Sequence, residues 1–352
     1  MRFHNKSYYQ FYYADHYNNF IRMLGYLVIE GVILIMVNTR DVLCRMKVSE
    51  LNNIIRIFEL KAGCRKKENI IDIIYEYMKN NMSYIFREYI IYDELNLLKR
   101  ICDNNFEMIR EEEDVHYQYV KSLSCIGLVY IDKEKSGVFI PEEFQMQIKS
   151  CLDNKCVIEF SKNRSDIIRM TENLLEFYGV FHLELLEDYI MERIGLGYRV
   201  HRAIEFIRKY NIRNNFYYED DDCFYYNLKI NDRTYMKMRT IEMNLKYKHY
   251  KESEIISIMN RKCSYENDIR LILNRVYKNC KVSDEIIKSI KFMVIEGRTT
   301  NEIGCFIKEK VKRLSDFGFK SIVRSIGKMR NSYIIWGFKG YYLEEINEEM
   351  MA

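Results

Sequence analysis

Apolar residues recur at the spacing of amphipathic helices along most of the chain that follows Met46. Leu51, Ile54 and Phe58 fall on one helical face, and the same spacing recurs in residues 251–328. The sequence is 48% hydrophobic and 30% charged, which excludes a disordered chain and a multi-span membrane protein. Because 352 residues are too many for one small core, we expect a mainly α protein with several domains and small β-hairpins.

The ten cysteines are scattered along the chain and do not form the close pairs that zinc sites usually need. No C-x-x-C occurs, and the two closest cysteines are Cys151 and Cys156. Cys125, Cys151 and Cys305 stand among apolar helix positions, where a free thiol behaves as a small hydrophobic side chain. The six histidines never pair at metal-binding spacing. We therefore expect a reduced, cytoplasmic protein with no metal and no cofactor.

The first 45 residues contain the only long apolar run, residues 24–37. As a helix this run would span about 21 Å, short of a bilayer core of roughly 30 Å, and Glu30 lies in its middle. A buried or interfacial element is therefore favoured over a membrane anchor, and no membrane span is expected. A third interpretation is that residues 1–35 are not normally translated. The codons for residues 30–32 can spell a ribosome-binding sequence, and Met36 follows at the spacing of a start codon.

Residues 46–82 predict two short helices joined by a basic bend. Ser49 can cap the first helix and Gly63 can end it. The bend brings four cations beside the N-terminus of the second helix, where backbone N–H groups and the helix dipole also favour an anion. These candidate nucleic-acid-binding residues are Lys61, Arg65, Lys66 and Lys67.

This stretch resembles the SAP and Rho N-terminal family of helix–extended-loop–helix modules. The matching residues are Ser49, Leu51, Ile54, Ile55, Phe58 and Leu60, followed by Gly63 and the K-K-E-x-I-I of residues 66–71. The resemblance implies binding of DNA or RNA through the loop and the start of the second helix, with Lys66 and Lys67 in the basic positions. Glu59 stands where a glycine often precedes the leucine. Many such modules instead contact proteins, so both interpretations stay open.

Two later segments, 84–155 and 160–248, each predict helices followed by a β-hairpin, at residues 128–140 and 216–226. Because this order is the outline of a winged helix, we expect tandem winged-helix-like units. A DNA-reading winged helix inserts a basic third helix into the major groove. The equivalent helix of the first unit has only Lys121, and that of the second is followed by an acidic turn, so protein contact is the favoured role. The cations of that second helix are Arg199, Arg202, Arg208 and Lys209.

Residues 250–352 predict a basic helical domain, since residues 250–343 hold 19 Lys and Arg against 10 Asp and Glu. Its end resembles that of an uncharacterised group of low-GC bacterial proteins, some of which carry a SEC-C metal-binding tail. That tail is absent here, so the resemblance implies no zinc. The only tryptophan lies in this segment and is expected to pack in a core, with peptide binding or base stacking as alternatives. The matching residues are Asn331, Trp336, Gly340, Tyr341 and Glu345.

Two classes of function remain open, because the sequence contains no P-loop, dinucleotide-binding, zinc-protease or serine-hydrolase motif. The first is a non-enzymatic protein that binds DNA or RNA through the basic bend, with help from residues 250–343, in transcription or its termination. The second is a scaffold whose winged-helix-like units contact a protein partner without any nucleic-acid role. The first class is favoured.

Overall fold

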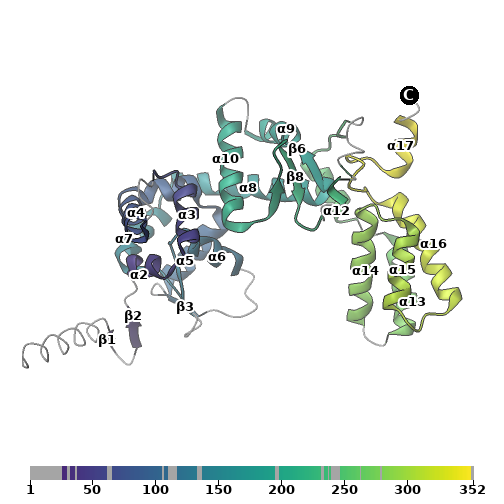
Figure 1. The fold of residues 1–352 in the computed structure, drawn as a ribbon, viewed down its shortest axis with the longest axis horizontal. Helices are drawn as coiled ribbons and strands as arrows, with labels where there is room; N and C mark the ends of the chain where they lie inside the picture. The colour runs from purple at the N-terminus through teal and green to yellow at the C-terminus, as the bar shows by residue number, and fades with distance from the viewer. Residues whose placement is uncertain are drawn as a thin grey trace, which may run out of the picture. The chain divides into compact units, whose positions relative to one another are not determined.

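The chain is mainly helical, as predicted, with two three-stranded antiparallel sheets and one two-stranded hairpin (Figure 1). The chain divides into two compact units, and each is described by itself. Unit 1 contains residues 1–165 and 212–214, and unit 2 contains residues 166–211 and 215–352. The boundaries expected inside these units, at residues 45, 82, 155 and 248, remain predictions. The computed structural model describes residues 26–29, 32–35, 38–61, 66–104, 107–109, 117–132, 137–194, 198–230, 234–236, 238, 246–261, 263–277 and 280–349.

The apolar run near the N-terminus contains a β-hairpin. Its length was compared with a bilayer above as if it were a helix. Strands β1 (Tyr26–Ile29) and β2 (Val32–Ile35) pair antiparallel, with Ile29 opposite Val32. Runs of β-branched residues pack well in strands, which accounts for this preference. Within the described ranges, no helix has both the length and the apolar character needed to cross a bilayer.

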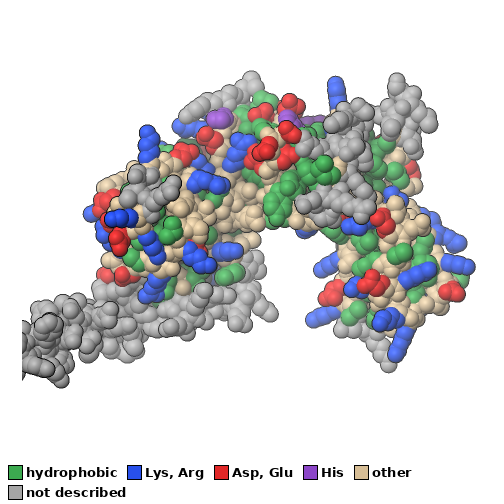
Figure 2. All heavy atoms as spheres, viewed as in Figure 1, with side chains coloured by type: hydrophobic (Ala, Val, Ile, Leu, Met, Phe, Trp, Pro, Cys, Tyr) green, Lys and Arg blue, Asp and Glu red, His purple; other side chains and the backbone are tan. Residues whose placement is uncertain are grey.

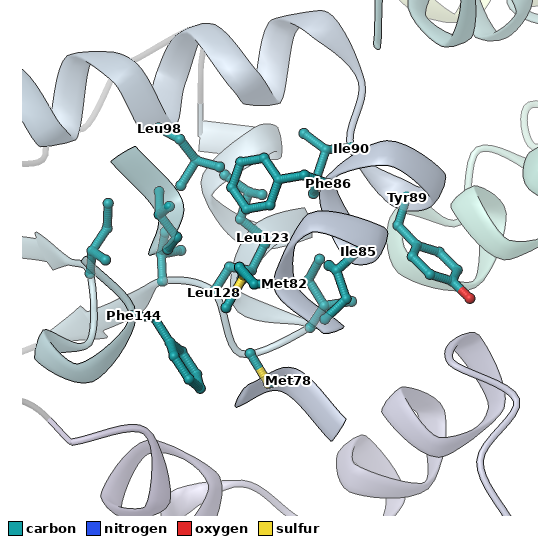
Figure 3. Close-up of a cluster of buried hydrophobic side chains, with 14 of the residues drawn as sticks. Met78, Met82, Ile85, Phe86, Tyr89, Ile90, Leu98, Leu123, Leu128 and Phe144 are labelled. Carbon is teal, nitrogen blue, oxygen red and sulfur yellow. The ribbon is translucent and has the colours of Figure 1, made fainter. Parts of the chain in front are cut away.

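Unit 1 is a group of helices around one hydrophobic core (Figure 3). The predicted apolar faces of residues 51–58 and 70–78 are buried in this core. The core also includes Ile85, further along the same helix as residues 70–78, and Leu98 and Phe144 from later helices. The two-helix module therefore shares its core with the segment that follows. The helices are α2 (Thr39–Arg45), α3 (Val48–Ile57), α4 (Lys67–Tyr89), α5 (Tyr92–Asp103), α6 (Tyr117–Ser124), α7 (Glu142–Leu152) and the first part of α8 (Lys155–Tyr178).

Helix α3 differs from its prediction at both ends. It starts at Val48 with Lys47 as the N-cap, so Ser49 lies inside its first turn. It ends before Gly63, because Glu59 adopts a left-handed conformation with φ of +56°. The N–H of Leu60 donates to the carbonyl of Ile55 at 2.9 Å, and that of Glu59 to Arg56 at 3.3 Å. This pair of bonds is a Schellman motif, which ends a helix without any residue further along the chain.

The sheet of unit 1 contains the predicted hairpin and one strand that the sequence analysis missed. The sheet order is β3-β5-β4, and all pairs are antiparallel. Strand β3 follows α5, whereas the hairpin strands follow α6. The strands are β3 (Glu107–Ile109), β4 (Tyr130–Asp132) and β5 (Gly137–Phe139).

The first part of unit 2 has the same order of helices and strands as the sheet region of unit 1, with one additional helix. The second part of α8 leads to β6 (Val180–His182), and α9 (Leu183–Ile194) and α10 (Tyr198–Asn214) follow. The predicted hairpin is present as β7 (Tyr217–Glu219) and β8 (Phe224–Asn227). Its strand β8 lies in the middle of the sheet β6-β8-β7, with Phe181 stacked against Tyr225 at 5.6 Å between ring centroids.

The remainder of unit 2 is helical, in agreement with the predicted periodicity. Helices α13 to α16 enclose a core of aliphatic side chains that includes Leu273, Ile290, Ile307 and Ile326, each with no exposed surface. The helices are α12 (Glu252–Met259), α13 (Ser264–Val276), α14 (Cys280–Ile295), α15 (Thr300–Lys310), α16 (Asp316–Ser332) and α17 (Leu343–Glu349).

Candidate nucleic-acid interface

The four predicted cations of the α3–α4 bend have different surroundings. Lys61 and Lys66 are exposed, and neither forms an ion pair with any described residue. Lys66 is the N-cap of α4, with an extended backbone and no capping bond from its side chain. Arg65 lies outside the described residues. Lys66 therefore presents an exposed ammonium group at the start of α4, and Lys61 presents another shortly after the end of α3.

Lys67 has a structural contact that the sequence analysis did not anticipate. Its Nζ donates a hydrogen bond to the backbone oxygen of Cys44, at 2.6 Å. Cys44 lies in the last turn of α2, where carbonyl groups have no partner within the helix. A cation at this end also interacts favourably with the helix dipole. Lys67 therefore joins α2 to α4, a contact between residues 23 positions apart.

Nearby charges both add to and oppose the basic character of the bend. Arg56, in the last turn of α3, is exposed and has no ion pair within the described part of the chain. Glu59 and Glu68 are exposed acids at the same bend. Arg40 is already paired with Asp72 at 2.8 Å. The available cations are thus Arg56, Lys61 and Lys66.

Helix α10 of unit 2 is the predicted third helix of a winged unit. One of its predicted cations, Arg208, is paired with an acid. The Nε of Arg208 lies 3.0 and 3.1 Å from the two carboxylate oxygens of Glu219, which belongs to β7. The acidic hairpin thus neutralises a cation of α10. Arg199 and Arg202, nearer the start of the helix, are exposed.

The side chain of the only tryptophan packs inside unit 2, as expected. The side chain of Trp336 is 1% exposed, and its Nε1 donates to the backbone oxygen of Glu176 at 2.8 Å. Gly179, with φ of +72°, lies against the ring, where an added Cβ would be 2.3 Å from the indole Cγ. Because the ring is enclosed, core packing is confirmed for Trp336.

The other residues of the tryptophan segment also hold the chain in place. Lys248 donates to Glu345 at 2.6 Å, and its Nζ lies 5.4 Å from the ring centroid of Tyr341. Burial is the largest single influence on Glu345 and opposes its ionisation. The hydrogen bond from Lys248, the hydrogen bond from the Tyr342 N–H and the charge of Lys248 together outweigh burial and hold the pKa of this carboxyl below its usual value. Gly340 has φ of +92° and lies close to the Lys248 carbonyl. These residues bind the end of the chain to the segment before α12.

Seven of the 19 basic residues of residues 250–343 lie in residues 308–328, at the end of α15, in the turn that follows it and along α16. The excess of charge is visible in the sequence, whereas the exposure of Phe317 within this basic group, at 84% of its side chain, is not. An exposed aromatic beside cations can be recognised only once the buried face of α16 is known.

No metal-binding cluster of side chains is found among the described residues. No group of three His, Cys, Asp or Glu side chains there is arranged to hold a metal ion. A depression of about 740 Å³ lies between the Asn81 region of α4 and α7, and it has no His, Asp or Glu in its lining. Its exposed apolar side chains are Tyr84 and Met146.

Comparisons with protein-family models, with curated proteins and with solved structures found no match. What this protein binds is therefore inferred from the charge and exposure of its own residues.

Proposed function

We propose that the protein is a non-enzymatic nucleic-acid-binding protein that contacts DNA or RNA through the α3–α4 bend. The observation that carries this proposal is the start of α4, where no side-chain cap is found among the described residues and the exposed Lys66 is the N-cap. The exposed Lys61 precedes Lys66 by five residues along the chain. The first N–H groups of a helix have no acceptor within it, and the helix dipole adds positive potential there. A phosphate at this position would receive backbone hydrogen bonds and two ammonium charges.

The arrangement of elements supports the same proposal. Helix α3, the bend and α4 fit a helix–extended-loop–helix module of the SAP and Rho N-terminal kind, and such a module would place the protein in transcription or its termination. In unit 2, the order α8-β6-α9-α10-β7-β8, with β8 central in the sheet, fits a winged-helix-like unit. In unit 1, the order α5-β3-α6-β4-β5 fits a shorter version of it. Both kinds of element recur in proteins that bind nucleic acid.

The experiment measures binding of labelled oligonucleotides to the Lys61→Glu/Lys66→Glu protein by fluorescence anisotropy at several salt concentrations. Lys67 is left intact because its bond to Cys44 supports the fold. We expect more than about a tenfold loss of affinity at low salt. The slope of log K against log salt should become shallower by about 0.7–0.9 for each phosphate that the variant no longer binds.

The matched control is Lys99→Glu/Lys121→Glu, which makes the same charge change at exposed residues of α5 and α6. This control should change affinity only slightly. Equal losses in the two variants would indicate a general effect of net charge and would contradict a site at the bend.

A scaffold that contacts a protein partner is the second candidate, and the pairing of Arg208 with Glu219 favours it. This pair reduces the charge that α10 could offer to a DNA groove. Purification of a stoichiometric protein partner, in salt-resistant complexes free of nucleic acid, would support the scaffold. The ratio of ultraviolet absorbance at nucleic-acid and protein wavelengths gives a first answer from the purified protein.

A further inference from the structure

We propose that the α15–α16 turn and the exposed face of α16 form a second contact surface for nucleic acid, at which Phe317 stacks on an unpaired base and selects single strands. This inference rests on the proposed nucleic-acid-binding function, but it concerns a different unit of the protein and different residues.

The first observation is a concentration of uncompensated positive charge. Residues 308–328 hold seven cations against two acids, Glu309 and Asp316. All seven cations are exposed, and none forms an ion pair with any described residue. Figure 2 shows Lys and Arg side chains spread over the α13–α16 region. The seven are Lys308, Lys310, Lys312, Arg313, Lys320, Arg324 and Lys328.

The second observation is the spacing of the cations along α16. Lys320, Arg324 and Lys328 follow at intervals of four residues, so they lie on one face at a rise of about 6 Å each. That rise is near the axial length of two nucleotides, since one strand carries one phosphate per roughly 3.4 Å. Gly327 on this exposed face has no neighbouring heavy atom within 4 Å of the position of a Cβ. The face is therefore an open row of positive charge.

The third observation is Phe317, which precedes Lys320 by three residues and Arg324 by seven and so lies on the same face. Its side chain is 84% exposed, whereas Phe319 packs partly against the helical core. Burying a phenylalanine normally stabilises a protein, so folding does not account for this exposed ring. Its neighbours on this face are charged, and they do not form an apolar groove for a helix or peptide.

Together these observations fit single-stranded nucleic acid better than other polyanions. Surfaces that bind single strands combine a basic track for the backbone with aromatic rings on which bases stack. The bases of a duplex are already stacked on each other and cannot reach Phe317, whereas an acidic peptide would use the cations but not the ring. The two parts of this surface therefore have separate roles: the cations attract the strand, and the ring distinguishes unpaired bases.

The experiment compares the Phe317→Ala and Phe317→Tyr variants of the full chain. The probes are a labelled single-stranded oligonucleotide, the duplex of the same sequence and an abasic strand of the same length. We expect Phe317→Ala to weaken single-strand binding by about 5- to 150-fold, the usual range for loss of one stacked base. Binding of the duplex and the abasic strand should stay within about twofold, and Phe317→Tyr should retain wild-type affinity. Because Phe317 is exposed, its replacement should leave the fold intact.

Two further variants separate the roles of charge and ring. Lys320→Glu/Arg324→Glu should weaken binding of all three probes and make the salt dependence shallower, because it removes cations that bind phosphates. Phe160→Ala, which removes another exposed phenylalanine, from α8, should have no effect on any probe. An unchanged single-strand affinity in Phe317→Ala, or an equal loss with the duplex, would overturn the inference. So would a polyglutamate peptide that binds more tightly than the oligonucleotide in a manner dependent on Phe317.

The outcomes also separate this inference from the proposed function. If only the Lys61→Glu/Lys66→Glu variant loses affinity, the α3–α4 bend binds nucleic acid and the α16 surface does not. If only the Phe317 and Lys320/Arg324 variants lose affinity, this surface stands and the bend is excluded. If wild-type protein binds no probe, both proposals are wrong.

Discussion

At the scale of single residues, Gly179 and Trp336 depend on each other. Gly179 has a left-handed φ, and its missing side chain leaves the space that the indole ring fills. We expect Gly179→Ala to lower the free energy of unfolding by about 2–5 kcal/mol, because a left-handed alanine is strained and its Cβ overlaps the ring. Chemical denaturation measures this difference.

Gly327→Ala is the matched control for this substitution. Gly327 lies on the exposed face of α16, where an added Cβ meets no atom within 4 Å. Alanine has the higher helix propensity, so this change should raise the free energy of unfolding by about 0.5–1 kcal/mol. A Gly179→Ala protein as stable as Gly327→Ala would show that the ring is not held as described.

Glu59 illustrates a second effect of backbone conformation. It occupies the left-handed position of the Schellman motif at the end of α3, where glycine has no steric cost. We expect Glu59→Gly to raise the free energy of unfolding by about 0.5–1 kcal/mol, since relief of the strain exceeds the loss of chain entropy. Thermal unfolding tests this, with Glu59→Ala as the control that keeps the Cβ. A lower melting temperature in Glu59→Gly than in Glu59→Ala would contradict it.

At the scale of elements, Arg213 and Glu94, both in unit 1, form a buried ion pair. The side chains of Arg213 and Glu94 are 1% and 0% exposed, and their closest charged atoms are 3.4 Å apart. Arg213 also donates to the Tyr89 carbonyl at 2.8 Å, while Glu94 accepts from the hydroxyl of Ser122. Each charge is therefore surrounded by polar partners from other elements.

Removing one member of this pair should be more harmful than removing both charges. Arg213→Met leaves the Glu94 carboxylate buried without its cation, which should lower the free energy of unfolding by about 3–5 kcal/mol. Adding Glu94→Gln removes the remaining charge and keeps one acceptor oxygen, which can still accept from the Ile91 N–H, so the double variant should recover part of this loss. A double-mutant cycle measures the coupling, and strictly additive losses would contradict it.

The helices could be predicted because their signal is local and periodic. The buried residues of α3 and α16 recur every three or four positions, and this pattern is visible in the sequence alone. Strands β3 and β6 were missed because three residues are too few to establish an alternating pattern. The candidate nucleic-acid site remains a prediction. Lys61 and Lys66 are exposed, whereas the bond from Lys67 to Cys44 depends on a fold that brings distant residues together and could not be read from the sequence.

At the scale of the whole molecule, the single tryptophan reports on one unit only. Trp336 lies in unit 2, whereas helices of both units contribute to circular dichroism. Proteins with more than one unit often unfold in separate steps. We expect Gly179→Ala to lower the midpoint of the unfolding transition seen by tryptophan fluorescence. Arg213→Met should lower the midpoint of part of the circular dichroism transition and leave the fluorescence transition unchanged. Coincident shifts of both signals in both variants would show that the chain unfolds as one cooperative unit.

The hydrogen bond between Trp336 and Glu176 joins residues 160 positions apart. Closing so long a loop is entropically costly, whereas the helices of the α13–α16 group are close neighbours in sequence and can associate quickly. Refolding should therefore produce most helical structure first, and the indole should reach its dry environment only in a slower, final phase. The kinetic order of assembly in unit 2 thus follows from where its one tryptophan is anchored.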